Sequence, residues 1–216
     1  MNWNGLELPD KPYYQDDAVI IYNADCRDIL PLIPDKSIDL VLTDPPYGIG
    51  ADKANAHSSI RDNPKWQDDW DYLQPEAIEL AIRLGKSAAV WGGNYYPDVL
   101  PASAAWLAWL KPEASTGFSL ADFELCWTNG LFAARCKTFN RRDGNAHPTQ
   151  KPVEVMTWTL SFFQASLLIL DPFLGSGTTA LASKILGRKC IGIEIEEKYC
   201  EIAAKRCSQT VMDLRI

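Results

Sequence analysis

The sequence lacks the residue spacing of a metal site. Its six cysteines form no Cys-x-x-Cys pair, and only two histidines, His57 and His147, accompany them. Structural zinc sites take closely spaced Cys and His ligands, so the sequence excludes a zinc site and we expect no metal. We interpret all six cysteines as reduced thiols that serve as small buried hydrophobic side chains.

The sequence also lacks a long apolar run and an excess of positive charge. No stretch reaches the roughly 20 apolar residues of a transmembrane helix, and the start of the chain has no leader pattern, so we expect a cytoplasmic protein without a membrane partner. The formal net charge is -7. A nucleic-acid-binding protein with this balance has to concentrate its basic residues locally, which makes any basic cluster informative.

Short apolar runs alternate with helical patterns over most of the chain. This alternation predicts an α/β fold, a doubly wound and mostly parallel sheet of about seven strands, in one domain over residues 1–216. The expected strands are 18–22, 38–43, 88–92, 105–110, 123–128, 167–171 and 189–195, and the expected helices are 75–86, 152–165, 178–186 and 196–211. Such sheets bind ligands beyond the carboxyl ends of their strands, so the residues after each strand are the candidates for chemistry.

A glycine-rich turn follows the strand that ends at Asp171. Gly175, Gly177 and Ala180 have the G-x-G-x-x-A spacing of a strand-to-helix nucleotide turn, in which a ligand approaches backbone N–H groups. Glu194, nineteen residues beyond Gly175 (194 − 175), ends the next strand and is placed to accept both hydroxyls of a ribose. A phosphate-binding P-loop would need Lys and then Ser or Thr after its last glycine, which this turn lacks, although a turn built only for close packing is an alternative.

A second turn, Asp44-Pro-Pro-Tyr47, follows the strand 38–43. The two prolines stiffen it and orient two acceptors, the Asp44 carboxylate and the Pro45 carbonyl. Such an acceptor pair suits an amino group whose nitrogen has to become more nucleophilic, and the Tyr47 ring offers a face for a base that has left its stack. By itself the turn could equally be only a rigid connection.

Three motifs together resemble those of the beta-class DNA amino-methyltransferases: Asp44-Pro-Pro-Tyr47, His147-Pro-Thr-Gln-Lys-Pro152 and Asp171-Pro-Phe-Leu-Gly-Ser-Gly-Thr-Thr179. The resemblance covers nearly the whole chain. It implies a circularly permuted, Rossmann-like class I methyltransferase fold, S-adenosylmethionine as cofactor and DNA as substrate, in a bacterial or phage-infected cell. Asp rather than Ser in the first motif implies methylation of adenine N6, with cytosine N4 as the alternative.

The resemblance assigns roles by position. Asp44, Pro45 and Tyr47 would hold the target base, with Pro46 shaping the turn. Asp25 would accept a hydrogen bond from the adenine of the cofactor, although an N-cap for a short helical turn is the competing interpretation. Lys151 would pair with the cofactor carboxylate. The cofactor pocket would comprise Asp25, Cys26, Asp44, His147, Thr149, Lys151, Asp171, Phe173, Gly175, Ser176, Gly177, Thr178, Thr179 and Glu194.

A local basic strip is the candidate for DNA binding. From Leu125 to Arg142 the chain has no acidic residue, but it has Phe132, Phe139 and four basic residues, Arg135, Lys137, Arg141 and Arg142. Such a strip predicts contact with a phosphate backbone, and a solvated hairpin face is the alternative. We expect a short target-recognition insertion at 129–146 and a mobile loop at 48–71, from which Trp66 and Trp70 contact DNA unless the two rings simply pack together.

Other functions are weaker interpretations. Methylation at cytosine C5 needs a nucleophilic cysteine, and no cysteine here follows a proline as that chemistry would require. A catalytically silent DNA-binding module and a methyltransferase of protein amide groups remain alternatives, but intact catalytic and cofactor turns argue against the first and the motif order against the second. Relatives of this class are often dimers, so we expect a homodimer; the recognition sequence is not encoded in these motifs.

Overall fold

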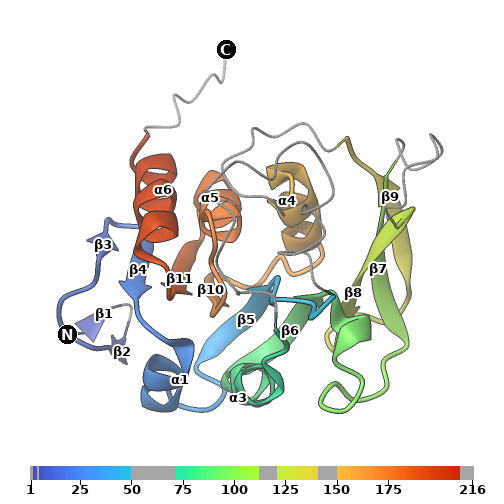
Figure 1. Ribbon diagram of the computed structural model, residues 1–216, viewed down its shortest axis with the longest axis horizontal. Coiled ribbons are helices and arrows are strands. Elements are labelled where there is room, and N and C mark those ends of the chain that lie inside the picture. Colours follow the sequence, from blue (N-terminus) through green and yellow to red (C-terminus); the bar gives the residue numbers. More distant parts are fainter. Residues whose placement is uncertain (1, 4, 50–71, 112–120, 141–149, 210–216) are drawn as a thin grey trace.

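The computed structural model describes residues 2–3, 5–49, 72–111, 121–140 and 150–209. They form one large sheet between two layers of helices (Figure 1). In spatial order the nine strands are β3 (Tyr14–Gln15), β4 (Val19–Asn23), β11 (Lys189–Glu194), β10 (Leu168–Asp171), β5 (Ile38–Thr43), β6 (Gly85–Trp91), β8 (Phe123–Thr128), β7 (Ala105–Leu110) and β9 (Arg135–Thr138). A separate hairpin pairs β1 (Asn2–Trp3) with β2 (Leu6–Glu7).

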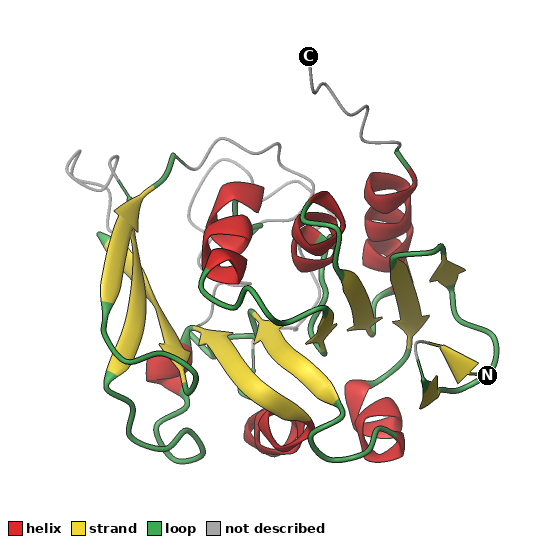
Figure 2. Cartoon of the chain, turned by 180° about the vertical axis from the view of Figure 1, so that it is seen from behind, coloured by secondary structure: helices red, strands yellow, loops and turns green. Residues whose placement is uncertain are grey.

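The central strands β4, β11, β10, β5 and β6 are parallel to one another, and β8 runs antiparallel to both of its neighbours. Their sequences are continuous apolar runs because both faces of the sheet are covered. Helices α4 (Val153–Ser161), α5 (Thr178–Ile185) and α6 (Glu197–Ser208) lie on one face, and α1 (Cys26–Ile29) and α3 (Pro75–Leu84) lie on the other (Figure 2). Two hydrophobic cores result, one under each layer of helices.

The predicted α/β fold and its mostly parallel sheet are confirmed. All seven expected strands are present: three have the expected bounds, and the ends of the other four differ by at most three residues. The helix expected at 75–86 ends at Leu84, because Gly85 and Lys86 already belong to β6. A Cβ at Gly85 would lie 2.9 Å from the Val41 side chain of β5, so close strand packing at this point suits glycine.

Four strands were not predicted. β1, β2 and β3 have two residues each, too few for an apolar period, and all four residues of β9 are exposed. The helices expected at 152–165 and 196–211 are shorter, since Pro152 is the N-cap of α4 and α6 ends at Ser208. The single-domain division and the two functional segments proposed at 48–71 and 129–146 stay predictions, and residues 50–71 and 141–146 lie outside the described part of the chain.

The cysteine prediction needs one correction. Five of the six free cysteines are buried, but Cys136 is exposed, because it lies on the solvent-facing edge strand β9. Within the described ranges, no group of His, Cys, Asp and Glu side chains could hold a metal ion. None of the helices described is long and apolar enough to cross a membrane.

Candidate active site at the carboxyl edge of the sheet

The carboxyl ends of four neighbouring parallel strands carry the predicted site. In the order β4, β11, β10 and β5, they lead to Asp25, Glu194, Asp171 and Asp44. Adjacent strands are about 4.8 Å apart, so these four acidic residues line roughly 15 Å of one edge. The fold therefore brings together residues that the sequence separates by up to 169 positions (194 − 25).

The glycine-rich turn is fixed at its base by Asp171. This carboxylate accepts hydrogen bonds from the Thr43 hydroxyl (2.7 Å) and from the Phe173 N–H (3.1 Å). Gly175 has a φ of +54°, and a Cβ built there would meet nothing within 4 Å, so open space lies beside the backbone at the tip of the turn. Gly177 also has positive φ and packs on α6, where a Cβ would lie 2.7 Å from Ala203 Cβ.

Glu194 closes this turn from β11. One carboxylate oxygen accepts from the Gly175 N–H and the other from the Glu196 N–H, both at 2.8 Å. Burial raises the pKa of Glu194 to about 7, although the two backbone donors oppose it. Burial likewise raises the pKa of Asp171 to about 6, against the hydrogen bonds of Thr179 and Thr43. Both carboxyl groups therefore titrate close to neutral pH.

Two side chains that the sequence did not single out hold the other side of the turn. Arg206 of α6 donates to the Ser176 carbonyl (2.7 Å), the Ser176 hydroxyl (3.0 Å) and the Thr178 hydroxyl (3.2 Å). The Ser176 hydroxyl in turn donates to the Gln150 side chain at 3.1 Å. The buried Ser176 and Thr178 hydroxyls thus have structural partners, and only an arginine near the end of a helix hinted at this in the sequence.

Asp25 is the N-cap of α1, as one of the two interpretations held. Its carboxylate accepts from the Arg27 N–H at 2.9 Å and pairs with the Arg27 guanidinium. Cys26 is buried in the core on the α3 side, and burial raises the pKa of its thiol to about 12. The Cys26 thiol is therefore neutral and packed in the protein. Asn23, at the end of β4, donates to the carbonyls of Glu194 and Ile195 and joins these two strand ends.

The Asp44-Pro-Pro-Tyr47 turn is held by three tyrosines. The Tyr96 hydroxyl donates to the Pro46 carbonyl, and the Tyr47 hydroxyl donates to Asp44 Oδ1 at 2.7 Å. The Tyr47 ring stacks on Tyr95, with ring centroids 4.9 Å apart and planes inclined by 22°. Gly92 has a φ of +68° and lies so close to the Tyr47 ring that a Cβ there would be 1.9 Å from its Cε1 atom. The turn and the end of β6 therefore fit together only with glycine at this position.

Lys151 has other partners than the cofactor carboxylate that the resemblance implied. Its Nζ lies 2.5 Å from Asp44 Oδ1, 2.9 Å from Glu124 Oε2 and 2.7 Å from the Tyr47 hydroxyl. Glu124, on β8, also pairs with Lys111, whose Nζ lies 2.5 Å from Glu124 Oε1. Burial raises the pKa of Asp44, an effect that the Lys151 ammonium opposes and the Glu124 carboxylate reinforces. Sequence analysis missed Glu124 and Lys111, since nothing local connects them with the catalytic turn.

Trp91, the last residue of β6, is a further unpredicted feature of this site. Its side chain is fully buried, and the Lys151 ammonium lies 5.6 Å from its ring centroid. Among the described residues, its indole N–H is the one buried side-chain donor or acceptor without a hydrogen-bond partner. Buried indoles normally find a partner, so this N–H is an exception within a densely charged site.

The predicted DNA-binding residues are only partly described. Arg135 and Lys137 lie exposed on the edge strand β9, which pairs with β7 and not with β8, so they do not belong to a β8–β9 hairpin. The Lys137 ammonium lies 5.0 Å from the Phe139 ring centroid. Phe132 is fully exposed in the segment that follows β8. β8 ends beside Ala88 of β6, so this segment leaves the sheet at the amino ends of the parallel strands, opposite the candidate site. Arg141, Arg142, Trp66 and Trp70, and His147 and Thr149 of the cofactor set, lie outside the described residues.

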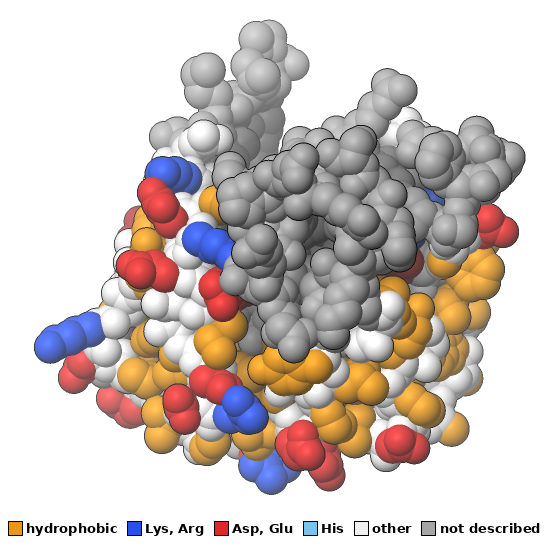
Figure 3. Space-filling model, in the orientation of Figure 1, with side chains coloured by type: hydrophobic (Ala, Val, Ile, Leu, Met, Phe, Trp, Pro, Cys, Tyr) orange, Lys and Arg blue, Asp and Glu red, His pale blue; other side chains and the backbone are white. Residues whose placement is uncertain are grey.

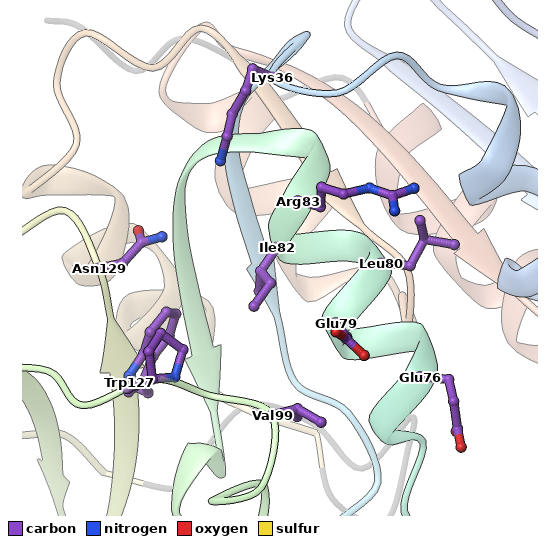
Figure 4. Close-up of a pocket in the computed structure, with 10 residues that line it drawn as sticks. Lys36, Glu76, Glu79, Leu80, Ile82, Arg83, Val99, Trp127 and Asn129 are labelled. Carbon is purple, nitrogen blue, oxygen red and sulfur yellow. Dashed lines mark hydrogen bonds between the residues drawn. The ribbon is translucent and has the colours of Figure 1, made fainter.

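A cavity of about 630 Å³ lies elsewhere, on the face of the sheet that α3 covers (Figure 4). Glu76, Glu79 and Arg83 of α3 border it on one side and Trp127 of β8 on the other. None of its lining residues belongs to the predicted site. Acidic side chains lie exposed over the lower part of the face seen in Figure 3, where α1 and α3 lie, with Lys and Arg side chains among them.

Comparisons with known proteins identify the family. The family model described as DNA methylase matches residues 90–205, which is more than half of the chain. Type II methyltransferase M2.LlaDCHI of Lactococcus lactis subsp. cremoris is 27% identical over 95% of each chain. Type II methyltransferase M2.MboI of Moraxella bovis is 27% identical over 91% of this chain and 90% of its own.

Solved structures show the same fold. The M1.HpyAVI–SAM complex superposes with a TM-score of 0.58 at 23% identity, covering 88% of this chain and 99% of the other. PvuII DNA methyltransferase, which is cytosine-N4-specific, gives a TM-score of 0.65 at 16% identity, covering 97% and 92%. The open space at Gly175 and the row of acceptors along the edge suit an extended ligand such as S-adenosylmethionine. The chain belongs to the DNA methylase family, whose members use S-adenosylmethionine to methylate an exocyclic amino group of a base in DNA.

Proposed function

We propose that this DNA methyltransferase acts on the N6 amino group of adenine, with the base flipped out of the duplex against the Asp44-Pro-Pro-Tyr47 turn. The observation that carries transfer to an amino group is the position of Asp44, which directly follows β5 beside the strand of the glycine-rich turn. The choice of adenine rests on Asp, in place of Ser, at this position of the family motif. An anionic acceptor at this point suits an amine that can donate two hydrogen bonds, one to Asp44 and one to the Pro45 carbonyl.

The proposed role of the turn is to make the amino nitrogen a better nucleophile. Its lone pair is delocalised into the base ring, and two fixed acceptors favour a tetrahedral nitrogen with a localised lone pair. S-adenosylmethionine, when bound, supplies an electrophilic methyl group. With the cofactor bound, the nitrogen would form the new N–C bond as the C–S bond breaks, the electron pair of that bond would stay on sulfur, and the nitrogen would lose one proton to solvent.

The cofactor assignment follows the order of residues along the edge. Asp25 at the end of β4 would meet the adenine, Glu194 the ribose, and the turn that starts at Asp171 the methionine part, which leaves the methyl group beside Asp44. This order repeats the order of the groups in S-adenosylmethionine. The Gly175 backbone borders open space where a ligand can approach. His147, Thr149 and Lys151 stay predicted members of the methionine end, with Lys151 at its border because its three N–H groups already have partners in Asp44, Glu124 and Tyr47.

The Tyr47–Tyr95 stack is the proposed platform for the flipped base. Stacking on aromatic rings offsets part of the few kcal/mol that unstacking a base costs. We assign the flanking phosphates to Arg135 and Lys137, together with Arg141 and Arg142, and further contacts to Trp66 and Trp70. A homodimer is part of the proposal. The recognition region between β8 and α4 is short, so a second subunit would supply further contacts with DNA.

Methyl transfer to DNA free of base methylation tests the proposal, with the products digested and identified by mass spectrometry. N6-methyladenine from the wild type, lost in Asp44→Ala, is the expected result. N4-methylcytosine as the product would instead make cytosine the target base. The similarly folded PvuII enzyme is cytosine-N4-specific. Cofactor binding without any transfer would favour a catalytically silent DNA-binding module.

A further inference from the structure

The Lys151 ammonium sits at the centre of a closed set of partners. Its three N–H groups face three acceptors, Asp44 Oδ1, Glu124 Oε2 and the Tyr47 hydroxyl, at 2.5, 2.9 and 2.7 Å. The Lys151 side chain is 4% exposed, so water does not compete for these groups. An ammonium has three donors, and this arrangement uses all of them.

Two carboxylates and two ammonium groups alternate through this cluster. The chain of contacts runs from Asp44 to Lys151, on to Glu124, and ends at Lys111, whose Nζ lies 2.5 Å from Glu124 Oε1. The two negative and two positive charges cancel. Buried charges are tolerated when paired in this way, whereas removal of one partner leaves its neighbour uncompensated.

Glu124 stays ionised in this cluster. Burial alone would raise its pKa, but the Lys151 and Lys111 ammonium groups hold the pKa of Glu124 at about 2. A carboxylate with so low a pKa is a poor proton acceptor near neutral pH. Glu124 is therefore suited to hold a cation and not to relay the proton that the methylated amine loses.

The target amine and Lys151 bind the same carboxylate. Asp44 Oδ1 already accepts from Lys151 and from the Tyr47 hydroxyl. An amino group that approaches this carboxylate has to share it with Lys151 or displace Lys151 from it. Lys151 can withdraw from Asp44 without losing all ionic contact only because Glu124 lies 2.9 Å from the same Nζ.

We propose that Glu124 is a positioning residue for methyl transfer, which retains the Lys151 ammonium when the target amino group binds the Asp44 carboxylate that Lys151 contacts in this structure. The inference rests on the proposed role of Asp44 as acceptor for the target amine. It holds for adenine and cytosine alike, since both bases carry an exocyclic amino group.

Glu124→Gln tests the inference, because it keeps the shape of the side chain and removes its charge. Lys151 then pairs with Asp44 alone, and the amine competes less well for this carboxylate. We expect kcat/KM for DNA to fall on the order of 100-fold. The Kd for S-adenosylmethionine, measured by calorimetry, should stay within about twofold of the wild-type value, as expected for a purely local change. Asp122→Asn, an exposed change two residues away, is the matched control and should behave as wild type.

The pH profile separates positioning from a purely structural role. The groups that face Asp44 and Glu124 are Lys151 before α4, Lys111 after β7, the Tyr47 hydroxyl, Cys126 of β8 and Asp171 of β10. In Glu124→Gln a negative charge is lost and Lys151 moves wholly to Asp44, so the acid limb of kcat/KM shifts to lower pH. In Lys111→Met, Glu124 draws Lys151 away from Asp44, so the acid limb shifts to higher pH.

Opposite shifts of the acid limb, with cofactor binding retained, are the expected result. Wild-type kcat/KM in Glu124→Gln would overturn the inference, as would a loss that comes with weaker cofactor binding and an unmoved acid limb. If Glu124→Gln does not fold, Lys111→Met decides alone by the presence or absence of its upward shift. The base methylated by the wild type is identified separately, so a failure of the adenine proposal is distinguishable from a failure of this one.

Discussion

Glu194 provides a prediction in which stability and cofactor affinity change in opposite directions with pH. Its pKa is about 7 in the folded protein against an ordinary value of 4.5, and burial is the main cause. A group whose pKa is raised by folding stabilises the protein below its unfolded pKa, and this contribution is lost as the pH rises through the folded pKa. The cofactor-free protein should therefore become more stable as the pH falls from 8 to 5.

The magnitude follows from the size of the shift. At about 1.4 kcal/mol per pKa unit, Glu194 contributes roughly 2 to 3 kcal/mol over this range. Asp171, with a pKa of about 6 against 3.8, adds roughly 1 kcal/mol in the same direction. Carboxyl groups with lowered pKa values, Glu124 and Asp16 among them, act only below about pH 4.5, outside this window.

Affinity for S-adenosylmethionine should show the opposite trend. In the proposed site an ionised Glu194 would accept from both ribose hydroxyls, whereas a protonated carboxyl group would have lost part of this capacity. The Kd should therefore rise on the order of tenfold between pH 8 and pH 6. Glu194→Gln should flatten the stability profile in the same range and remove most of the pH dependence of binding.

Urea unfolding of the cofactor-free protein and calorimetric titration with S-adenosylmethionine, both between pH 5.5 and 8.5, measure the two trends. Comparison with Glu194→Gln subtracts the titration of the ligand itself. Glu197→Gln, a change three residues along the chain at an exposed side chain, is the control and should keep both wild-type profiles. An affinity that is equal at pH 6 and pH 8 in the wild type would refute the assignment of Glu194 to the ribose.

Three further predictions test separate parts of the molecule. Gly92→Ala should lower kcat at least tenfold while cofactor affinity is kept, because the new Cβ would collide with the Tyr47 ring and displace it. Steady-state kinetics and calorimetry check these two expectations, and an unchanged kcat would contradict the first. Lys137→Ala should raise KM for DNA and reduce the slope of log K for DNA binding against log salt concentration by about one unit. Lys205→Ala, at an exposed side chain of α6, should change neither. Arg188→Met should lower the free energy of unfolding by about 1 to 3 kcal/mol, since Arg188 donates to the Leu160 and Phe163 carbonyls at the end of α4; urea unfolding that matches the wild type would exclude this capping role.

Much of the edge of the sheet could be predicted from the sequence, because its parts are continuous segments. The strand, turn and helix around Gly175 and Gly177 stand together in one stretch, and so do β5 and the turn at Asp44. The apolar runs of the central strands are clear because both faces are buried. β9 could not be found in this way, since an exposed strand at the edge of a sheet has no apolar period to reveal it.

The charged cluster around Lys151 could not be predicted for a different reason. Glu124 stands in a strand whose other residues are mostly apolar, and an acid in such a strand was the one available signal. Its partners Lys111 and Lys151 come from the end of β7 and the start of α4, so only the packed sheet brings the three together. The family motif singled out Lys151, but its partners depend on strands that no motif describes.

The hydrogen bond between Thr43 and Asp171 explains how two motifs 127 residues apart (171 − 44) can form one site. Parallel strands are joined by crossovers, so strands that are neighbours in the sheet need not be neighbours in the chain. β5 pairs with β10 through Leu40 and Val41, and this register sets the catalytic turn beside the cofactor turn whichever comes first in the sequence. The permuted order therefore leaves the site intact. It also leaves Asp44 close enough to Asp171 for the charge of one carboxylate to raise the pKa of the other, so the two turns are coupled through charge as well as through the sheet.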